Sequence, residues 1–293
     1  MRSRLVRGLV VGALPLAFAA CSGTATPPYP DVATFCVAKA HAICQATAIC
    51  AADPTACQTY QVSQCDADAT SATASGVRKY SSSNAPSCID ALNAAFGNNP
   101  SQVPFAQLVG PGSITDKCER VFVGSANSNQ ACASDYDCSG ALICVPAQTG
   151  TPSSPLVCAS PVAKNAMDYC DEPGAQCPTD TYCGTPAGGV AAACIPAAQA
   201  GQACSATAPC VSAERCTNSL CVPRASSSGQ PCSTNGDCIS PTPYCDVYAG
   251  SICTIGLTFA TGAADCEGFL LGMTVAGPDA GGAPAGDGAG GDP

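Results

Sequence analysis

The feature that most restricts the fold of this sequence is a spacing of four cysteines that occurs four times. Five or six residues separate the first three cysteines of each set, and the fourth follows after a variable interval. The sets are Cys132, Cys138, Cys144 and Cys158; Cys170, Cys177, Cys183 and Cys194; Cys204, Cys210, Cys216 and Cys221; and Cys232, Cys238, Cys245 and Cys253. Such a repeat predicts tandem small modules in which disulfide bonds replace a large hydrophobic core.

Cysteine is frequent in the chain as a whole. There are 25 cysteines among 293 residues, whereas tryptophan is absent and Phe and Tyr number only 7 and 8. In an oxidising compartment cysteines at this density form disulfide bonds, and in a reducing one they would indicate metal binding. We expect an exported protein in which 24 cysteines are paired: the 16 of the repeats together with Cys36, Cys44, Cys50, Cys57, Cys65, Cys88, Cys118 and Cys266.

Residues 1–20 have the composition of a secretory signal peptide. Three arginines lie among the first seven residues, an apolar run follows from residue 8 to residue 18, and small residues end the segment. This order is typical of a signal removed on export, and the run is shorter than the roughly 20 residues of a membrane span. No later segment is expected to span a bilayer.

The sequence Phe-Ala-Ala-Cys at residues 18–21 resembles the lipobox of bacterial lipoproteins, with Phe18 where that motif usually has leucine. The resemblance implies cleavage before Cys21 and lipid attachment to its thiol. Because Ser22 follows rather than aspartate, it also implies sorting to the outer membrane. Cysteine parity agrees, since removing Cys21 leaves an even number. The alternative is ordinary cleavage after residues 17–19.

The charge of the chain limits its partners. Beyond the signal, 8 basic residues face 21 acidic ones, a net charge of −13. That balance argues against a basic patch for nucleic acid or anionic lipid. We therefore expect no nucleic-acid partner, a membrane contact only through the lipid anchor, and a protein or glycan ligand.

Residues 21–30 predict a flexible tether and residues 31–97 a helical domain stapled by disulfides. Three helices are expected there. The first follows Asp31 as N-cap and runs to Ala48, and the second begins at Pro54 and runs to about Cys65. The third ends at Phe96, before Gly97, and a weaker helix is expected near residues 77–80.

In each of the first two predicted helices, seven residues separate two cysteines. Positions i and i+8 lie about 80° apart around a helix, on one broad face. Two antiparallel helices would then be joined by nested bonds, and the cysteine in the connecting loop would be free to reach the third helix. The expected pairs are Cys36–Cys65, Cys44–Cys57 and Cys50–Cys88.

The remaining segments follow from turn residues and spacing. Residues 98–126 are expected to form a connector containing one short strand near residues 118–124. The repeats should consist of short strands between turns, because Gly, Asn, Asp and Pro interrupt the sequence every few residues. Their expected ranges are 127–160, 161–197, 198–224 and 225–272, the last with a C-terminal closure, and residues 273–293 predict a disordered tail.

The repeats share more than their cysteines. Gln stands two residues before the first cysteine of three repeats, Asp precedes the second cysteine of two, and Tyr precedes the third of two. This pattern resembles the Dickkopf N-terminal cysteine-rich domain, and bacterial lipoproteins with such tandem arrays look similar, including a helical N-terminal part. The resemblance implies a disulfide framework over about residues 127–254. The receptor-modulating activity of the animal family is not carried over.

Two cysteines flank the array, Cys118 before it and Cys266 after it. If the two pair with each other, the array must fold back until its ends nearly touch. If each joins the neighbouring repeat in a shifted register, the array extends. Tandem repeats with short linkers more often extend, so we favour the shifted register.

No catalytic constellation is apparent. His41 is the only histidine and has Cys44 three residues on, but oxidised cysteines cannot complete a zinc site. Asp135, Asp137 and Asp237 lack the pattern of a calcium loop, so a structural role in turns is favoured. We expect no catalytic residue, no metal site and no cofactor.

The fold class is therefore small and disulfide-rich, with an α-helical N-terminal subdomain followed by four short-β, disulfide-stapled repeats. The expected function is non-enzymatic: a lipid-anchored protein of the cell envelope, in the outer membrane, that presents rigid modules for binding or structural roles. The alternative is a small-scaffold protease inhibitor that would insert the loop of residues 211–215 into an active site.

Overall fold

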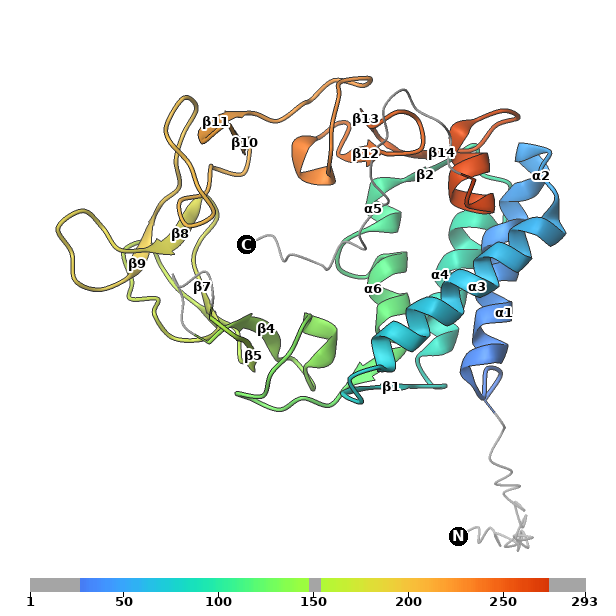
Figure 1. Ribbon diagram of the computed structural model, residues 1–293, viewed down its shortest axis with the longest axis horizontal. Helices are drawn as coiled ribbons and strands as arrows, with labels where there is room; N and C mark the ends of the chain where they lie inside the picture. The colour runs from blue at the N-terminus through green and yellow to red at the C-terminus, as the bar shows by residue number, and fades with distance from the viewer. Residues whose placement is uncertain (1–26, 148–153, 274–293) are drawn as a thin grey trace, which may run out of the picture.

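A computed structural model describes residues 27–147 and 154–273 of the chain. The helical part lies on one side, and the repeats form an arc that leaves it and returns to it (Figure 1). The expected signal peptide, the lipidated Cys21 and the C-terminal tail lie outside the described residues, apart from the tail's first residue, 273. The expected fold class is confirmed: a helical N-terminal region is followed by short strand pairs stapled by disulfides.

The first two helices begin where their capping residues predict. Helix α1 (Val32–Ile43) starts after Asp31, whose carboxylate accepts a hydrogen bond from the Thr34 amide, and it continues through η1 (Cys44–Ala46) into α2 (Thr47–Cys50). Helix α3 (Pro54–Thr73) is capped in the same way by Asp53. It runs well beyond Cys65, and residues 78–80 form strand β1 (Arg78–Tyr80) instead of the weak helix expected there.

Helix α4 (Ala85–Phe96) ends before Gly97, as predicted. Its buried face contributes Cys88, Ile89, Leu92 and Phe96 to the core. The Gly97 amide donates to the Asn93 carbonyl, and a Cβ at position 97 would lie 2.4 Å from that oxygen, so glycine is required by the close approach.

The segment expected to be a connector is instead part of the helical core. It contains β2 (Gln102–Pro104), α5 (Phe105–Leu108), α6 (Ile114–Glu119) and β3 (Phe122–Gly124). Strand β3 pairs antiparallel with β1, and Val121 and Phe122 are buried in the same cluster as Phe35. The strand predicted near residues 118–124 is therefore shorter, because Cys118 lies on α6.

The end of the chain also returns to this core. Strand β14 (Gly256–Thr258) pairs antiparallel with β2, and η4 (Cys266–Leu270) follows (Figure 1). Phe96 on α4 packs against Phe259 and Phe269, with ring centroids 5.9 Å apart in both pairs. The C-terminal closure, grouped by sequence with the fourth repeat, thus completes the helical core.

Four disulfides hold the core, and two of them differ from expectation. The nested bonds Cys36–Cys65 and Cys44–Cys57 are confirmed. The expected Cys50–Cys88 bond is wrong, since Cys88 pairs with Cys118, and Cys50 pairs with Cys266. Neither alternative for the two flanking cysteines is correct, because both bond to the helical region rather than to each other or to a repeat.

Within the described residues, one helical stretch, Val32–Cys50, is long and apolar enough by composition to cross a membrane. About 44% of its apolar window is buried in the protein, and Cys36, Cys44 and Cys50 bond it to other elements. A core helix of this kind passes the same test, so the stretch carries no conclusion about a membrane.

Each repeat contains one antiparallel hairpin of short strands, and the first and last repeats add a 3₁₀ turn. In the second repeat a short parallel pair precedes the hairpin. The hairpins are β4 (Ile143–Pro146) with β5 (Leu156–Ala159), β8 (Thr181–Gly184) with β9 (Ala193–Pro196), β10 (Glu214–Thr217) with β11 (Leu220–Pro223), and β12 (Tyr244–Asp246) with β13 (Ile252–Thr254); the parallel pair is β6 (Val162–Ala163) with β7 (Ala175–Gln176), and the turns are η2 (Asp135–Asp137) and η3 (Asn235–Asp237).

The bond that closes the arc should contribute more stability than a bond inside a repeat. Cys50 and Cys266 are separated by 216 positions, whereas Cys204 and Cys216 are separated by 12. In the chain-entropy model, replacing the first pair by alanine should lower the free energy of unfolding by about 2.5 kcal/mol more than replacing the second pair. Denaturant unfolding of the two double variants measures this difference.

Peptide mapping without reduction is the control for this comparison. The native protein should yield one linked peptide pair containing Cys50 and Cys266 and another containing Cys88 and Cys118. A link between Cys50 and Cys88 would contradict the closed arc, as would equal stability losses in the two double variants.

Candidate functional site

The four repeats share one disulfide pattern, in which the first cysteine bonds to the third and the second to the fourth. The third and fourth cysteines also lie opposite each other in the hairpin register. The two bonds of each repeat therefore lie side by side, and three of the four sulfur atoms lie within 4.8 Å of one another. The pairs are Cys132–Cys144, Cys138–Cys158, Cys170–Cys183, Cys177–Cys194, Cys204–Cys216, Cys210–Cys221, Cys232–Cys245 and Cys238–Cys253.

Sulfur groups this compact would suit a metal ion only as thiolates. Every cysteine in them is bonded to another cysteine, so in this oxidised state the repeats offer no thiolate ligand. The sulfur pairs act instead as the buried centre of each repeat. In the fourth repeat the cluster of buried apolar residues consists of its four cysteines alone.

The residue three positions before the first cysteine has the same conformation in every repeat. Asn129, Met167, Gly201 and Gly229 all have a positive φ, between 65° and 81°. The amide of each donates a hydrogen bond to the carbonyl of the fourth cysteine of its repeat. The left-handed conformation explains why Gly or Asn stands at this position in three repeats, and Met167 adopts it at a steric cost.

The glutamine that follows this residue closes a turn just before the first cysteine of the repeat. Oε1 of Gln130 accepts a hydrogen bond from the Asn127 amide at 2.6 Å, and Oε1 of Gln202 accepts one from the Gln199 amide at 2.8 Å. In the second repeat Asp168 takes this position and accepts from the Asn165 amide. In the first and third repeats the shared Gln is therefore explained by a local hydrogen bond.

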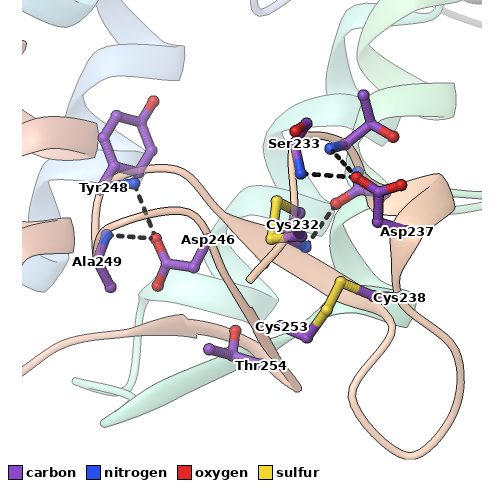
Figure 2. The surroundings of a disulfide bond; sticks show 12 residues. Cys232, Ser233, Asp237, Cys238, Asp246, Tyr248, Ala249, Cys253 and Thr254 are labelled. Carbon is purple, nitrogen blue, oxygen red and sulfur yellow. Dashed lines mark hydrogen bonds between the residues drawn. A yellow bond between two sulfur atoms is a disulfide. The ribbon is translucent and has the colours of Figure 1, made fainter. Parts of the chain in front are cut away.

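The aspartates beside the second cysteines have the structural role predicted for them. Oδ2 of Asp137 accepts hydrogen bonds from the Ala133 and Ser134 amides, and Asp237 accepts from the equivalent amides of Ser233 and Thr234 (Figure 2). Each carboxylate closes a capping box around its 3₁₀ turn.

Asp135 holds its repeat together in a related way, since its Oδ1 accepts from the Cys144 amide at 2.6 Å. Asn235 makes the equivalent bond to the Cys245 amide in the fourth repeat. The carboxylates of Asp135 and Asp137 thus bind backbone amides, which is the turn role preferred over calcium from the sequence.

Neighbouring modules are joined by individual polar contacts. Asp180 of the second repeat accepts from the Ser212 amide of the third, and this bond lowers the pKa of the carboxyl group. Between the helical core and the first repeat, the Tyr136 ring packs against the guanidinium groups of Arg78 and Arg120. Their Cζ atoms lie 5.5 and 5.7 Å from the ring centroid. These contacts restrict how adjacent modules rotate.

The third and fourth repeats are joined by an ion pair. Nη1 of Arg215 lies 2.8 Å from Oδ1 of Asp237. Burial by itself would raise the pKa of Asp237, but the hydrogen bonds from Arg215 and from the two backbone amides outweigh it, and the pKa lies below its usual value. Arg215 lies on strand β10 rather than on a projecting loop, which does not suit the inhibitor hypothesis.

His41 is exposed near the end of α1, and Cys44 is bonded to Cys57. The zinc pair weighed from the sequence is therefore not formed, since a disulfide sulfur is not a thiolate ligand.

The sequence did not single out a pair of buried aspartates. Asp246 on β12 and Asp265 just before η4 are each only 2% exposed. Oδ1 of Asp246 accepts from the Tyr248 and Ala249 amides (Figure 2), and Oδ2 of Asp265 accepts from the Thr258 amide. Burial, with Asp246 beside it, raises the pKa of Asp265 to about 7. Isolated Asp residues are common, so no local sequence signal marks the pair.

No family model, no curated protein and no solved structure matches this chain. The structure by itself supports a cysteine-rich protein of tandem short-strand repeats. The Dickkopf and lipoprotein resemblances rest on the sequence motifs alone.

Backbone strain at the positive-φ position gives a matched pair of predictions. Replacing Gly201 by alanine should lower the free energy of unfolding by about 1 kcal/mol, because the new Cβ meets no atom within 4 Å and only the left-handed conformation opposes it. Met167→Gly should lower the free energy of unfolding less than Gly201→Ala does, or raise it, because glycine adopts the positive φ of position 167 without strain. Thermal unfolding of both variants checks the sign, and equal losses would contradict this explanation.

The cap at Asp237 should make stability depend on acid pH. Its pKa is lowered on folding, so its contribution is complete above the unfolded-state pKa and is lost as the pH falls through the folded-state pKa. Asp237→Asn should lower the free energy of unfolding by about 1–2 kcal/mol near neutral pH and by less in acid. Asp90→Asn, an exposed position on α4, is the control. A loss at Asp237 that does not change with pH would contradict a role for its charge.

Proposed function

We propose that this chain is an exported lipoprotein of a bacterial cell envelope, anchored at Cys21 in the outer membrane, which displays its disulfide repeats as a rigid, non-enzymatic binding or structural surface. The observation that carries the proposal is the pairing of all 24 cysteines between residues 36 and 266 in 12 disulfides. Disulfides at this density form and persist in oxidising compartments.

Support for the anchor comes from the sequence. The total of 25 cysteines is odd, and Cys21 is the one left over once the 12 bonds are made. Its place after a basic and apolar segment, in a lipobox-like motif, suits lipid attachment.

The second repeat is the best candidate for a binding face. Hairpin β8–β9 lies at the far side of the arc from the helical core (Figure 1). Four large side chains of this repeat are exposed, and the three most exposed are Val190 fully, Met167 at 63% and Tyr169 at 54%, with Val162 at 37%. Exposed aromatic and apolar side chains on a rigid frame suit recognition of a protein or glycan partner.

Mass spectrometry of the mature N-terminal peptide tests the anchor. We expect a peptide that begins at Cys21 and carries a diacylglyceryl group, and Cys21→Ala should move the protein from the membrane fraction to the soluble fraction. An unmodified peptide beginning at Ala20 would refute the lipoprotein proposal.

Capture from an envelope extract tests the binding face. Full-length Cys21→Ala protein should retain a partner that is lost when Met167, Tyr169 and Val190 are all changed to serine. The same triple change leaves every cysteine in place, so an unchanged disulfide map is the control for folding. Equal capture by both proteins would exclude this face.

A further inference from the structure

A groove lies between the end of helix α3 and the start of the first repeat (Figure 1). Its volume is about 640 Å³, within the range of sites that hold a small ligand or a short stretch of peptide. Residues 68–77, at the end of α3 and in the turn after it, line the groove together with residues 131–134 of the first repeat. The groove is therefore separate from the exposed face of the second repeat.

Residues 131–134 carry an unpaired strand edge beside this groove. Ala131 lies opposite Val157 of strand β5. The hydrogen bonds to that strand are made by its two neighbours, the Gln130 carbonyl and the Cys132 amide. In this antiparallel pattern the N–H and C=O of Ala131 point away from β5, and within the described residues neither group takes part in a hydrogen bond. Such an edge can pair with one more strand.

The fourth repeat differs at the equivalent position. Pro231 lies opposite Ile252 of strand β13 and follows Gln230, just as Ala131 follows Gln130. Proline has no N–H and cannot donate to an added strand. The first repeat therefore keeps a backbone donor that the fourth repeat lacks.

The exposed charge of the groove is negative. Its lining residues include the carboxylates of Asp68 and Glu119, that of the turn residue Asp137, and one guanidinium, on Arg78. Lys39 pairs with Asp68, and Arg78 pairs with Glu119. The side chains of these two acids are 66% and 42% exposed, whereas those of the two cations are 21% and 8% exposed. A ligand that enters the groove therefore meets carboxylate oxygens, which favour a basic group.

A smaller cavity of about 40 Å³ adjoins the groove, and Asp68, Ala72 and Glu119 line both. Phe35 and Phe122 contribute apolar surface to this cavity. It has room for a small apolar side chain and excludes a large one. The groove and the cavity together therefore offer a strand edge, an acidic rim and a small apolar niche.

We propose that this groove binds an extended segment of a protein partner, in which a lysine or arginine stands near a small apolar residue. The segment adds a strand to the edge at Ala131, its basic side chain pairs with Asp68, and its small side chain enters the cavity. A peptide backbone suits this edge better than a glycan does, because a glycan has no alternating N–H and C=O groups. The site goes beyond the proposed binding face of the second repeat and does not depend on it.

A phage-displayed library of random eight-residue peptides, selected on full-length Cys21→Ala protein, tests the proposal. The selected peptides should be enriched in lysine and arginine, and added salt should weaken their binding. Ser71→Trp fills the groove from an exposed position on α3 and should abolish binding, whereas Ser63→Trp, on the same helix but outside the groove, should not. Asp68→Asn should weaken binding by about two- to fivefold, and Asp66→Asn is its matched control.

Ala131→Pro tests the strand pairing itself. Pro231 stands at the equivalent position of the fourth repeat, so the fold of a repeat accommodates the change. Loss of one backbone hydrogen bond should weaken binding of a selected peptide by roughly two- to tenfold. Ala203→Pro, at the equivalent position of the third repeat, should leave binding unchanged. An unchanged disulfide map and Tm are the control for folding.

Several outcomes would overturn the proposal. Failure to select any peptide, selection of peptides without basic residues, or equal binding to the Ser71→Trp protein would exclude the groove. Binding unaffected by Ala131→Pro would exclude the added strand. A dimer that Ser71→Trp dissociates would show that a second copy of the chain is the occupant. The triple serine change at Met167, Tyr169 and Val190 should leave peptide binding unchanged, so the two proposals fail independently.

Discussion

The bond between Cys50 and Cys266 joins positions 216 residues apart, and the course of the whole array follows from it. Because β3 leads into the first repeat and β14 leads out of the last, both ends of the array are fixed on one helical core. The repeats between them must curve (Figure 1). Aromatic packing of Phe259 and Phe269 on Phe96 adds an apolar contribution at the same junction, so closure does not depend on one covalent bond alone.

Within the arc, each module replaces a hydrophobic core with two adjacent disulfides. The fourth repeat buries only its four cysteines as an apolar cluster, too little surface to fold a module of this size without cross-links. The shared polar residues then stabilise local turns. Gln130 and Gln202 accept hydrogen bonds from backbone amides three residues earlier, and Asp137 and Asp237 cap a 3₁₀ turn. A motif made of such residues repeats because the same turns must be built again.

Much of this could be predicted where the signal is local. Asp31 and Asp53 mark helix starts, the eight-residue spacing of cysteines predicts the Cys36–Cys65 and Cys44–Cys57 bonds, and the repeat pattern predicts the stapled hairpins. Pairings over long distances could not be predicted. The helical region has six cysteines, an even number, so they could all pair among themselves. Instead, short elements of three to six residues between Gln102 and Gly124 place Cys118 against α4, where it bonds to Cys88. The burial of Asp246 and Asp265 likewise arises only once β12 and the closure segment are packed on the core.

A closed frame of this kind changes what the repeats can do as a set. In an open chain of modules each linker would add rotational freedom, and a partner that contacts two modules would have to order them on binding. Here the Ser212 amide donates to Asp180, Arg215 pairs with Asp237, and the ends are held on the core, so the positions of neighbouring repeats are restricted. In the binding role proposed above, recognition across several repeats would therefore cost little conformational entropy. The junction of the fourth repeat with the helical core, where Cys50 bonds to Cys266 and β14 pairs with β2, fixes the far end of the array and so restricts how all four repeats move.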